Sequence, residues 1–430
     1  QDNGSTQRER NEADLEAPIG IATTRFEDRV MSSLGVGGHA EIKFEESQSL
    51  CGAGILFLLP SLLAQGLLKT KDVYQLPPNH YYGLESIVLT IAFMALARIK
   101  NPEQLKQCKP GEIGRIIGLD RVPEVKCLRE KIKLLTEQNR AVNLNNLLID
   151  DWYSDTQKEN ADFLYIDGHV RIYYGTKANL PAKFISRQKL CLSATTEYWV
   201  NDAQGMPVMM VLGELTEKLQ IAIEDMIIPQ LAEAGLITLD VTENTQIQST
   251  FIFDREAYEP AFFNRLWITY KIAVITYRKN VKDKWQEECF KNFDVSVSEQ
   301  LINMDLCEQE TMLGGYHFRE IRKLGESGHQ TSIITTHPSL EMPVIAGRMF
   351  TRWSQENFFR YLILDYDFDK MISFGVESIS LEKKVVNPEY RKVNHQLKKL
   401  REKIQRVESK IYPLAEEMIN APLEAVPTIN

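Results

Sequence analysis

The sequence predicts an α/β fold in which a helical region precedes a mixed sheet. Residues 46–150 carry apolar stretches at helical spacing, punctuated by Gly and Pro. From about residue 160 the pattern changes to short alternating runs rich in β-branched and aromatic residues, which is typical of strands. The chain has 430 residues, 43% of them hydrophobic and 25% charged, so it is long enough for two or three globular domains.

The order of the predicted elements narrows the fold class. The predicted strands cover 164–175, 193–205, 207–216, 248–256 and 271–280, with helices at 217–236 and 260–267. Three meandering strands followed by two crossovers is the topology of the RNase H-like fold, so we predict such a core with a mixed five-stranded sheet. In that topology the first and fourth strands are neighbours. Catalytic groups of such folds lie at strand ends, where loops open to solvent.

Six segments follow from the composition and the pattern. We predict a disordered acidic tail (1–45), a helical domain (46–150), the first part of the core (160–280), an insertion (281–345), the last part of the core (346–378) and a basic C-terminal helix (381–414). The formal net charge is -9, yet residues 381–410 hold ten Lys/Arg and four Asp/Glu. Local patches decide whether a phosphate backbone is attracted, so the net charge does not exclude nucleic acid.

A helix, turn and helix lie inside the helical domain. A short helix at 113–117 ends at Gly118, and a second helix opens near Asp120 and Pro123. This arrangement is compatible with a helix-turn-helix unit that presents Lys126 and Arg129 to DNA phosphates. Ordinary packing of two helices explains the pattern equally well.

Two apolar patterns have alternative readings. Residues 50–68 have the length of a membrane span, but Pro and Gln interrupt them, so we predict buried helices and no membrane. Six cysteines without C-x-x-C spacing fit a reducing cytoplasm. The segment 393–414 has apolar residues at alternating spacings of four and three. We favour packing of that helix on the chain's own core over a coiled coil.

Three acidic residues in fold order indicate phosphoryl transfer. Asp167 lies in the first strand, Asp254 ends the fourth, and Glu356 lies on a late helix. Two-metal phosphoryl transfer needs such converging carboxylates, because Mg²⁺ prefers hard oxygen ligands. Each acid alone has a plainer explanation: a residue on an exposed strand face, a cap or turn former, and a surface helix residue.

The segments around these acids resemble the motifs of a known family. YIDGH (165–169), IFDRE (252–256) and RWSQENFF (352–359) resemble the three acidic motifs of DDE transposases from bacterial insertion sequences. Arg352 and Glu356 match R-x3-E of the Y-x2-R-x3-E signature, whereas Met349 and Ile363 stand where that signature has Tyr and Lys. The resemblance runs from about 50 to 375, and ATTEYWVNDAQGMPV also resembles an uncharacterised set of transposases of this type.

The resemblance implies a transposase that cuts DNA and transfers strands of an insertion sequence, in the bacterial cytoplasm at the nucleoid. Asp167, Asp254 and Glu356 would hold two Mg²⁺ or Mn²⁺ ions. A homodimer would bring element ends and target DNA together in a synaptic complex. The predicted DNA contacts are Arg352, His169, Arg255, Lys126, Arg129 and Lys279.

Two other functions share part of this pattern. A catalytically inactive DNA-binding protein derived from a transposase would keep the fold, although all three acids are present here. A glycosidase also uses paired carboxylates, but the eightfold βα repeat and the aromatic-rich sugar cleft pattern are missing from the sequence.

Overall fold

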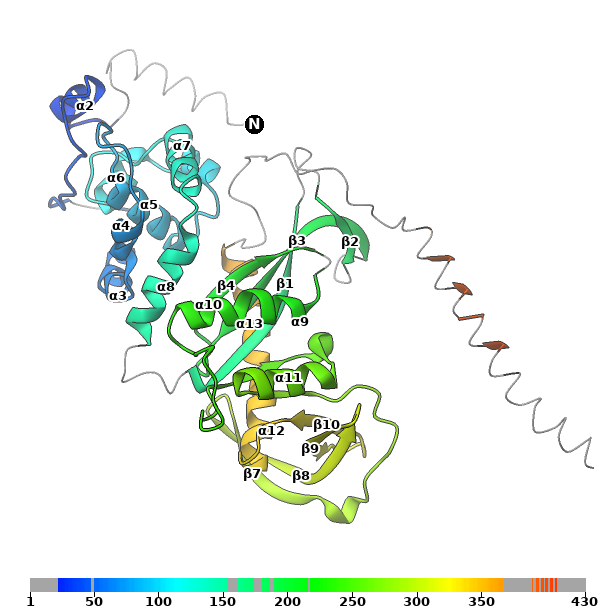
Figure 1. The fold of residues 1–430 in the computed structure, drawn as a ribbon. Coiled ribbons are helices and arrows are strands. Elements are labelled where there is room, and N and C mark those ends of the chain that lie inside the picture. The colour runs from blue at the N-terminus through cyan, green and yellow to red at the C-terminus, as the bar shows by residue number, and fades with distance from the viewer. Residues whose placement is uncertain are drawn as a thin grey trace, which may run out of the picture.

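A computed structural model gives the structure of the chain (Figure 1). It describes residues 22–47, 50–153, 161–173, 180–185, 189–215 and 217–366, and in the C-terminal part residues 389, 392–393, 396–397, 399–400, 403–404 and 407. Within these ranges a helical region stands beside a region built on one long sheet.

The described residues from 53 to 152 are helical and pack around α5. The helices of this region are η1 (Ala53–Leu58), α3 (Leu59–Ala64), η2 (Leu67–Lys69), α4 (Thr70–Val73), α5 (Leu84–Leu96), η3 (Pro102–Gln107), α6 (Pro110–Ile116), α7 (Val125–Thr136) and α8 (Ala141–Trp152). Between α6 and α7 the chain turns at Gly118, whose φ of 76° favours glycine. A Cβ on Gly114 would lie 2.5 Å from Cα of Arg121, so α6 packs closely on the connection that leads to α7.

One mixed sheet of ten strands forms the rest of the framework. Its strands are β1 (Phe163–Ile172), β2 (Ala182–Ile185), β3 (Leu190–Asn201), β4 (Pro207–Gly213), β5 (Ser249–Phe253), β6 (Ile272–Tyr277), β7 (Lys291–Val297), β8 (Gln300–Leu313), β9 (Tyr316–Leu324) and β10 (Gln330–Thr335). The order is β2-β3-β1-β5-β6-β10-β9-β8-β7, with β4 also paired to β3. β1 pairs antiparallel with β3 and parallel with β5, so the predicted adjacency of the first and fourth strands is confirmed.

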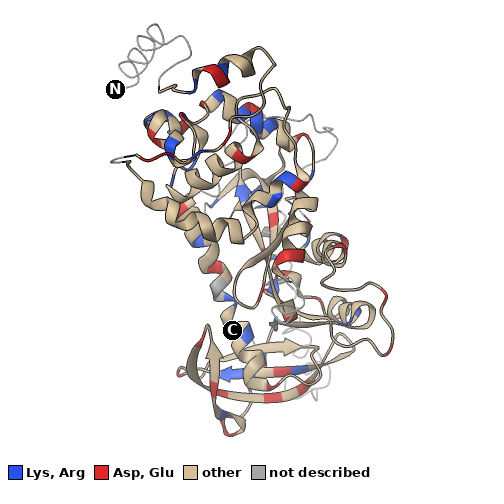
Figure 2. Cartoon of the chain, turned by 90° about the vertical axis from the view of Figure 1, so that its left-hand side faces the viewer, with Lys and Arg blue, Asp and Glu red and all other residues tan. Residues whose placement is uncertain are grey.

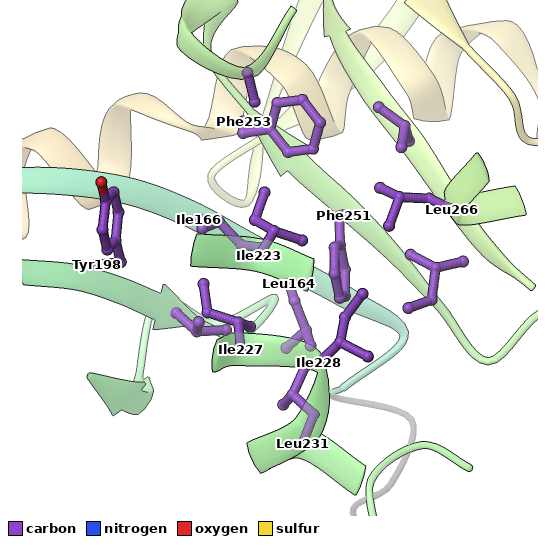
Figure 3. Close-up of a cluster of buried hydrophobic side chains, with 14 of the residues drawn as sticks. Leu164, Ile166, Tyr198, Ile223, Ile227, Ile228, Leu231, Phe251, Phe253 and Leu266 are labelled. Atoms are coloured by element: carbon purple, nitrogen blue, oxygen red, sulfur yellow. The ribbon is translucent and has the colours of Figure 1, made fainter. Parts of the chain in front are cut away.

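Helices cover both faces of this sheet. One face carries α9 (Leu219–Ala222), the π-helical turn η5 (Ile223–Ile227), α10 (Ile228–Glu233) and α11 (Pro260–Tyr270), and the other carries α12 (Met342–Thr351) and α13 (Trp353–Tyr366). Figure 3 shows the first layer, in which Leu164, Phe251 and Ile223 pack together. The alternate residues Tyr165 and Ile252 belong to a second core beneath α12. Successive side chains of β1 and β5 therefore point alternately into the cores on the two faces of the sheet.

The predicted insertion extends the sheet, which corrects the five-stranded prediction. β10 pairs antiparallel with β6, and β9, β8 and β7 follow as a meander. α12 packs on these strands so tightly that a Cβ on Gly347 would lie 2.4 Å from the carbonyl oxygen of Ser296. The sequence predicted only an insertion here, because the pairing of β10 with β6 depends on contacts distant in sequence.

The predicted disordered tail contains an ordered segment. Helix α2 (Phe26–Ser33) is docked by the buried Asp120, whose carboxylate accepts hydrogen bonds from the Thr24 and Arg25 amides. The same carboxylate forms an ion pair with Arg29 at 2.6 Å and accepts a hydrogen bond from Tyr81 at 2.7 Å. Asp120 thus anchors α2 rather than starting a helix. Of the predicted tail, 1–21 lie outside the described residues.

The apolar segment 50–68 is not buried as predicted. Phe57 is 89% exposed, and Leu58 and Leu63 are also exposed. Among the described residues, no single helix is long and apolar enough to cross a membrane; one pair, Ala53–Ala64 with Leu67–Val73, meets the length and composition test together but bends by 62°.

Candidate active site

Two of the predicted acids lie at adjacent positions of neighbouring strands. The parallel register of β1 and β5 pairs Ile166 with Phe253, so Asp167 and Asp254 each follow directly on this pair. Both side chains belong to the face that carries α12 and α13, because the apolar residues before them point to the opposite layer. Asp254 also accepts a hydrogen bond from the Arg255 amide at 2.7 Å and caps the short helix η6 (Arg255–Ala257). Asp254 can therefore cap this short helix and still be a candidate acid of the site.

The helix that carries the third acid is fixed across β1 and β3 by its neighbours. Gln355 is 1% exposed, and its Nε2 donates to the carbonyl oxygens of Tyr165 and Trp199 and to Oδ1 of Asn201. One turn further, the ring of Phe359 stacks on His169 with centroids 5.0 Å apart. These contacts fix the part of α13 that carries Glu356 on β1 and β3.

A buried guanidinium links the three acids electrostatically. Nη2 of Arg352 lies 2.7 Å from Oε1 of Glu356, one helical turn away, and the Arg352 side chain is almost fully buried. Burial lowers the pKa of Arg352, but the charges of Asp167, Asp254 and Glu356 outweigh it and raise the pKa. Arg352 and Glu356, which match R-x3-E, therefore form an intrahelical ion pair, and Asp167 and Asp254 also influence the guanidinium electrostatically.

The carboxyl group of Asp167 is the most perturbed acid of this cluster. Burial raises the pKa of Asp167 to about 6, although Arg352 and the Gly168 amide oppose the shift. The negative charges of Glu256 and Glu356 raise it further. Such perturbation by desolvation and specific charges is frequent at functional sites.

The ligand set suits a hard cation, while the carboxylates do not form a metal cluster in this conformation. Within the described ranges, no group of three or more acidic, His or Cys side chains is arranged to hold a metal ion. The prediction that Asp167, Asp254 and Glu356 lie within a few ångströms of one another, as a metal site needs, is therefore not met in this structure. Carboxylate oxygens are the donors that Mg²⁺ and Mn²⁺ prefer, and in this structure Glu356 is paired with the Arg352 guanidinium instead. The carboxylates of Asp167, Asp254 and Glu356 would suit such a cation when the Arg352 side chain moves away from Glu356.

The sequence analysis missed a fourth acid at the site. Glu256 influences Asp167 electrostatically, and its Oε2 lies 3.7 Å from where a Cβ on Gly168 would stand. The turn capped by Asp254 folds Glu256 back toward β1. Its position two residues after Asp254, within a helix of a single turn, is the signal that could have indicated it.

The predicted DNA contacts divide into buried and accessible groups. His169 is 1% exposed beneath Phe359, so its prediction as a phosphate contact is wrong for this conformation. Arg255 is exposed near the ring of Tyr277, at 5.6 Å from its centroid. Lys279 is half-buried beside Tyr258, at 5.8 Å from that ring centroid.

The two predicted contacts on α7 differ in their surroundings. Lys126 is exposed, whereas Arg129 forms an ion pair with Glu103 at 2.6 Å. Figure 2 shows blue and red residues intermixed over the described surface. Two helices, α6 and α7, are present where a helix-turn-helix unit was predicted, and residues 117–124 join them; contact with DNA stays a prediction.

The chain belongs to a transposase family. The family described as "Transposase protein" matches residues 20–417, which covers the helical region and the whole sheet. A comparison with curated proteins gave no match.

Solved structures give more distant similarities. The chain resembles the piggyBac transposase in a synaptic complex with hairpin DNA, with 11% sequence identity, a TM-score of 0.37, and coverage of 73% of this chain and 68% of that one. It also resembles the Marinitoga piezophila Argonaute in complex with guide RNA and target DNA, with 10% identity, a TM-score of 0.18, and coverage of 49% and 27%. Neither overlap is close enough to place a residue of the site.

Proposed function

We propose that this transposase-family protein is a DDE enzyme with an RNase H-like core that cuts and joins DNA strands of a bacterial insertion sequence. The observation that carries the proposal is the placement of Asp167 and Asp254 after one register pair of β1 and β5, with the buried Arg352, paired to Glu356, under the electrostatic influence of all three acids. The strand order β4-β3-β1-β5-β6, with the first three antiparallel and the last three parallel, supports the fold assignment.

Each residue of the site has a distinct proposed role. Asp167, Asp254 and Glu356 would hold Mg²⁺ or Mn²⁺, which lowers the pKa of the attacking water and offsets charge at phosphorus when bound. Arg352 neutralises the acids in the present arrangement, and its planar guanidinium is suited to a DNA phosphate once a cation replaces it. Gln355 keeps the helix of Glu356 in place.

DNA is the proposed partner, both at the element ends and at the target. The exposed Arg255 and Lys126, together with Arg129 and Lys279, are the proposed contacts, and such phosphate contacts make binding salt-dependent. We further propose that two copies act together in a synaptic complex in the bacterial cytoplasm. A catalytically inactive DNA-binding protein is the second candidate; the presence of all three acids in the sequence favours the enzyme.

A nicking assay separates the two candidates. Supercoiled DNA carrying the element ends is incubated with the full chain and Mg²⁺ or Mn²⁺, with EDTA as the control. We expect relaxed circles and 3′-hydroxyl ends that depend on the cation. DNA retention at low salt without any cation-dependent nicking would favour the inactive candidate.

Cation binding should weaken in acid because of Asp167. Its pKa of about 6 means that the neutral form prevails below that pH, and the cation must displace a proton to bind. We therefore expect the affinity for Mn²⁺, measured by calorimetry without DNA, to be constant above about pH 7. Below pH 6 it should fall by roughly tenfold per pH unit, as competition with one proton requires. An affinity that is flat from pH 7 to pH 5 would exclude Asp167 as a ligand.

A further inference from the structure

A tyrosine that ends β6 lies level with two of the candidate acids. The parallel register of β5 and β6 pairs Phe253 with Thr276, so Asp254 and Tyr277 each follow directly on this pair. Asp167 stands at the same level on β1, which is the other neighbour of β5. The two aspartates and the tyrosine therefore occupy corresponding positions on three adjacent parallel strands.

The side chain of Tyr277 lies on the same face of the sheet as these acids. Tyr277 packs against the core beneath α12 that contains Tyr165 and Ile252. Those two core residues precede the aspartates by two positions, and side chains two apart on a strand share a face. Phe350 of α12 also lies beside Tyr277, with ring centroids 6.5 Å apart. The phenol ring is thus held in place on the side of the sheet that carries the candidate site.

The charges that act on Tyr277 are those of the candidate site. Burial raises the pKa of Tyr277, the charge of Arg352 lowers this pKa, and the charge of Asp254 raises it. Arg255 and Glu356 act in the same two opposite directions. The guanidinium carbon of Arg255 lies 5.6 Å from the centroid of the tyrosine ring. The phenol is therefore a further member of the site that contains the acids.

The fold does not use the hydroxyl group of Tyr277. Two buried tyrosines of the neighbouring strands donate their hydroxyl groups to backbone carbonyl oxygens, Tyr165 to Arg348 and Tyr198 to Glu217. In the part of the chain that the structure describes, no hydrogen bond joins the Tyr277 hydroxyl to another residue. Tyr277 is half-buried, so its hydroxyl can donate to a ligand that reaches the site from outside.

We propose that Tyr277 binds the DNA strand at this site, by donating a hydrogen bond from its hydroxyl group to an oxygen of a backbone phosphate. The inference rests on the proposed function, because it takes the acids as the place where the strand is held. A phosphate that approaches carboxylates is repelled by their charge, so it needs donors nearby. Arg352 is paired with Glu356, whereas a neutral hydroxyl is not drawn into an ion pair and stays available.

Tyr277→Phe tests the proposal, because it removes the hydroxyl group alone. The full chain is titrated with a short duplex DNA in Ca²⁺, which supplies the carboxylates with a hard cation. The sequence of the duplex is free, since phosphate contacts carry no sequence information. We expect Tyr277→Phe to weaken the affinity by roughly tenfold or more, as the loss of a hydrogen bond to a charged group would. The slope of log affinity against log salt should not change, because a neutral hydroxyl releases no counterion.

Two other variants are the controls for this measurement. Arg255→Gln removes an exposed charge beside the same ring and should reduce the salt slope by about one. Tyr316→Phe makes the same chemical change at a half-buried tyrosine of β9, and its affinity should stay within about twofold of the unchanged chain. An unchanged affinity of Tyr277→Phe would overturn the proposal. A loss of affinity that comes with a large drop in unfolding temperature would overturn it too, because the hydroxyl would then serve the fold.

The binding measurement also separates this inference from the proposed function. Nicking of supercoiled DNA in Mg²⁺ should fall in Tyr277→Phe together with the affinity. If the unchanged chain does not nick DNA but Tyr277→Phe still weakens binding, the enzyme proposal fails and the phosphate contact stands. If the unchanged chain nicks DNA, and Tyr277→Phe binds and nicks equally well, only the role of Tyr277 is refuted.

Discussion

Asp167→Asn should reduce cation-dependent DNA nicking by roughly a thousandfold. Asparagine keeps the shape of the side chain but removes a negative charge from the ligand set, and each 1.4 kcal/mol of lost charge stabilisation costs about a factor of ten in rate. The fold should tolerate the change well, because burial already raises the pKa of Asp167 and so disfavours the charged form. We expect an unchanged or higher unfolding temperature together with the loss of activity.

This combination distinguishes a role in the reaction from a role in folding. Asp240→Asn is the matched control, because it makes the same chemical change at an exposed position outside the site. Its nicking rate should stay within about twofold of the unchanged chain, as expected for surface substitutions. Nicking by the Asp167 variant at a similar rate would remove Asp167 from the mechanism, and a large drop in unfolding temperature would indicate a structural role instead.

The sequence predicted the acids on β1 and β5 because their positions follow from local patterns. Asp167 interrupts an apolar alternating strand, and Asp254 follows a run of five buried residues. The strand order then brings the two strands side by side. An acid inside an apolar strand and an acid directly after one are both visible in a single sequence, so choosing these two candidates needed no knowledge of distant contacts.

Other features of the site depend on contacts that the sequence does not display. His169 seemed available to DNA, yet α13 covers it, and that helix is held by a hydrogen bond between Gln355 and Asn201, 154 residues away. The relation of Arg352 to all three acids is likewise a product of this docking. Pattern and spacing therefore indicated the candidate acids, whose role stays a prediction, while the docking of α13 decides which of their neighbours are accessible.

Distant contacts also decide the burial of charged residues in β7–β10, the strands that extend the predicted sheet. The run REIRKL (319–324) seems suited to a solvent-exposed strand, but Arg322 is 0% exposed and Glu320 is also buried. Arg322 donates to Glu320 and to Asp283, and its guanidinium carbon lies 4.2 Å from the centroid of the Trp285 ring. Burial of an arginine is stable only with such partners, and none of them can be read from the alternation of the strand.

Glu320→Ala should destabilise the junction between the added strands and the core by about 3–5 kcal/mol, the usual effect of breaking a buried ion pair. Glu320 accepts hydrogen bonds from Arg322 on its own strand, from Ser332 on β10 and from Arg278 just after β6. Its removal deprives the buried Arg322 charge of its buried carboxylate partner and leaves it paired with the exposed Asp283. Hydrogen exchange of the amides in β9 and β10 should accelerate by roughly a hundredfold or more, since exchange there follows the free energy of opening.

Two further variants serve as controls for the prediction on Glu320→Ala. Glu308→Ala removes the carboxylate of a half-exposed pair with Arg319 in the same sheet, and it should cost less than about 1 kcal/mol. Glu320→Leu combined with Arg322→Met replaces the buried charges by apolar side chains and should recover most of the loss, because neither charge is then left unpaired. If Glu320→Ala accelerates exchange no more than Glu308→Ala does, the buried network does not hold the added strands to β6. The position of Lys279, two residues beyond the end of β6, would then have to be fixed by other contacts.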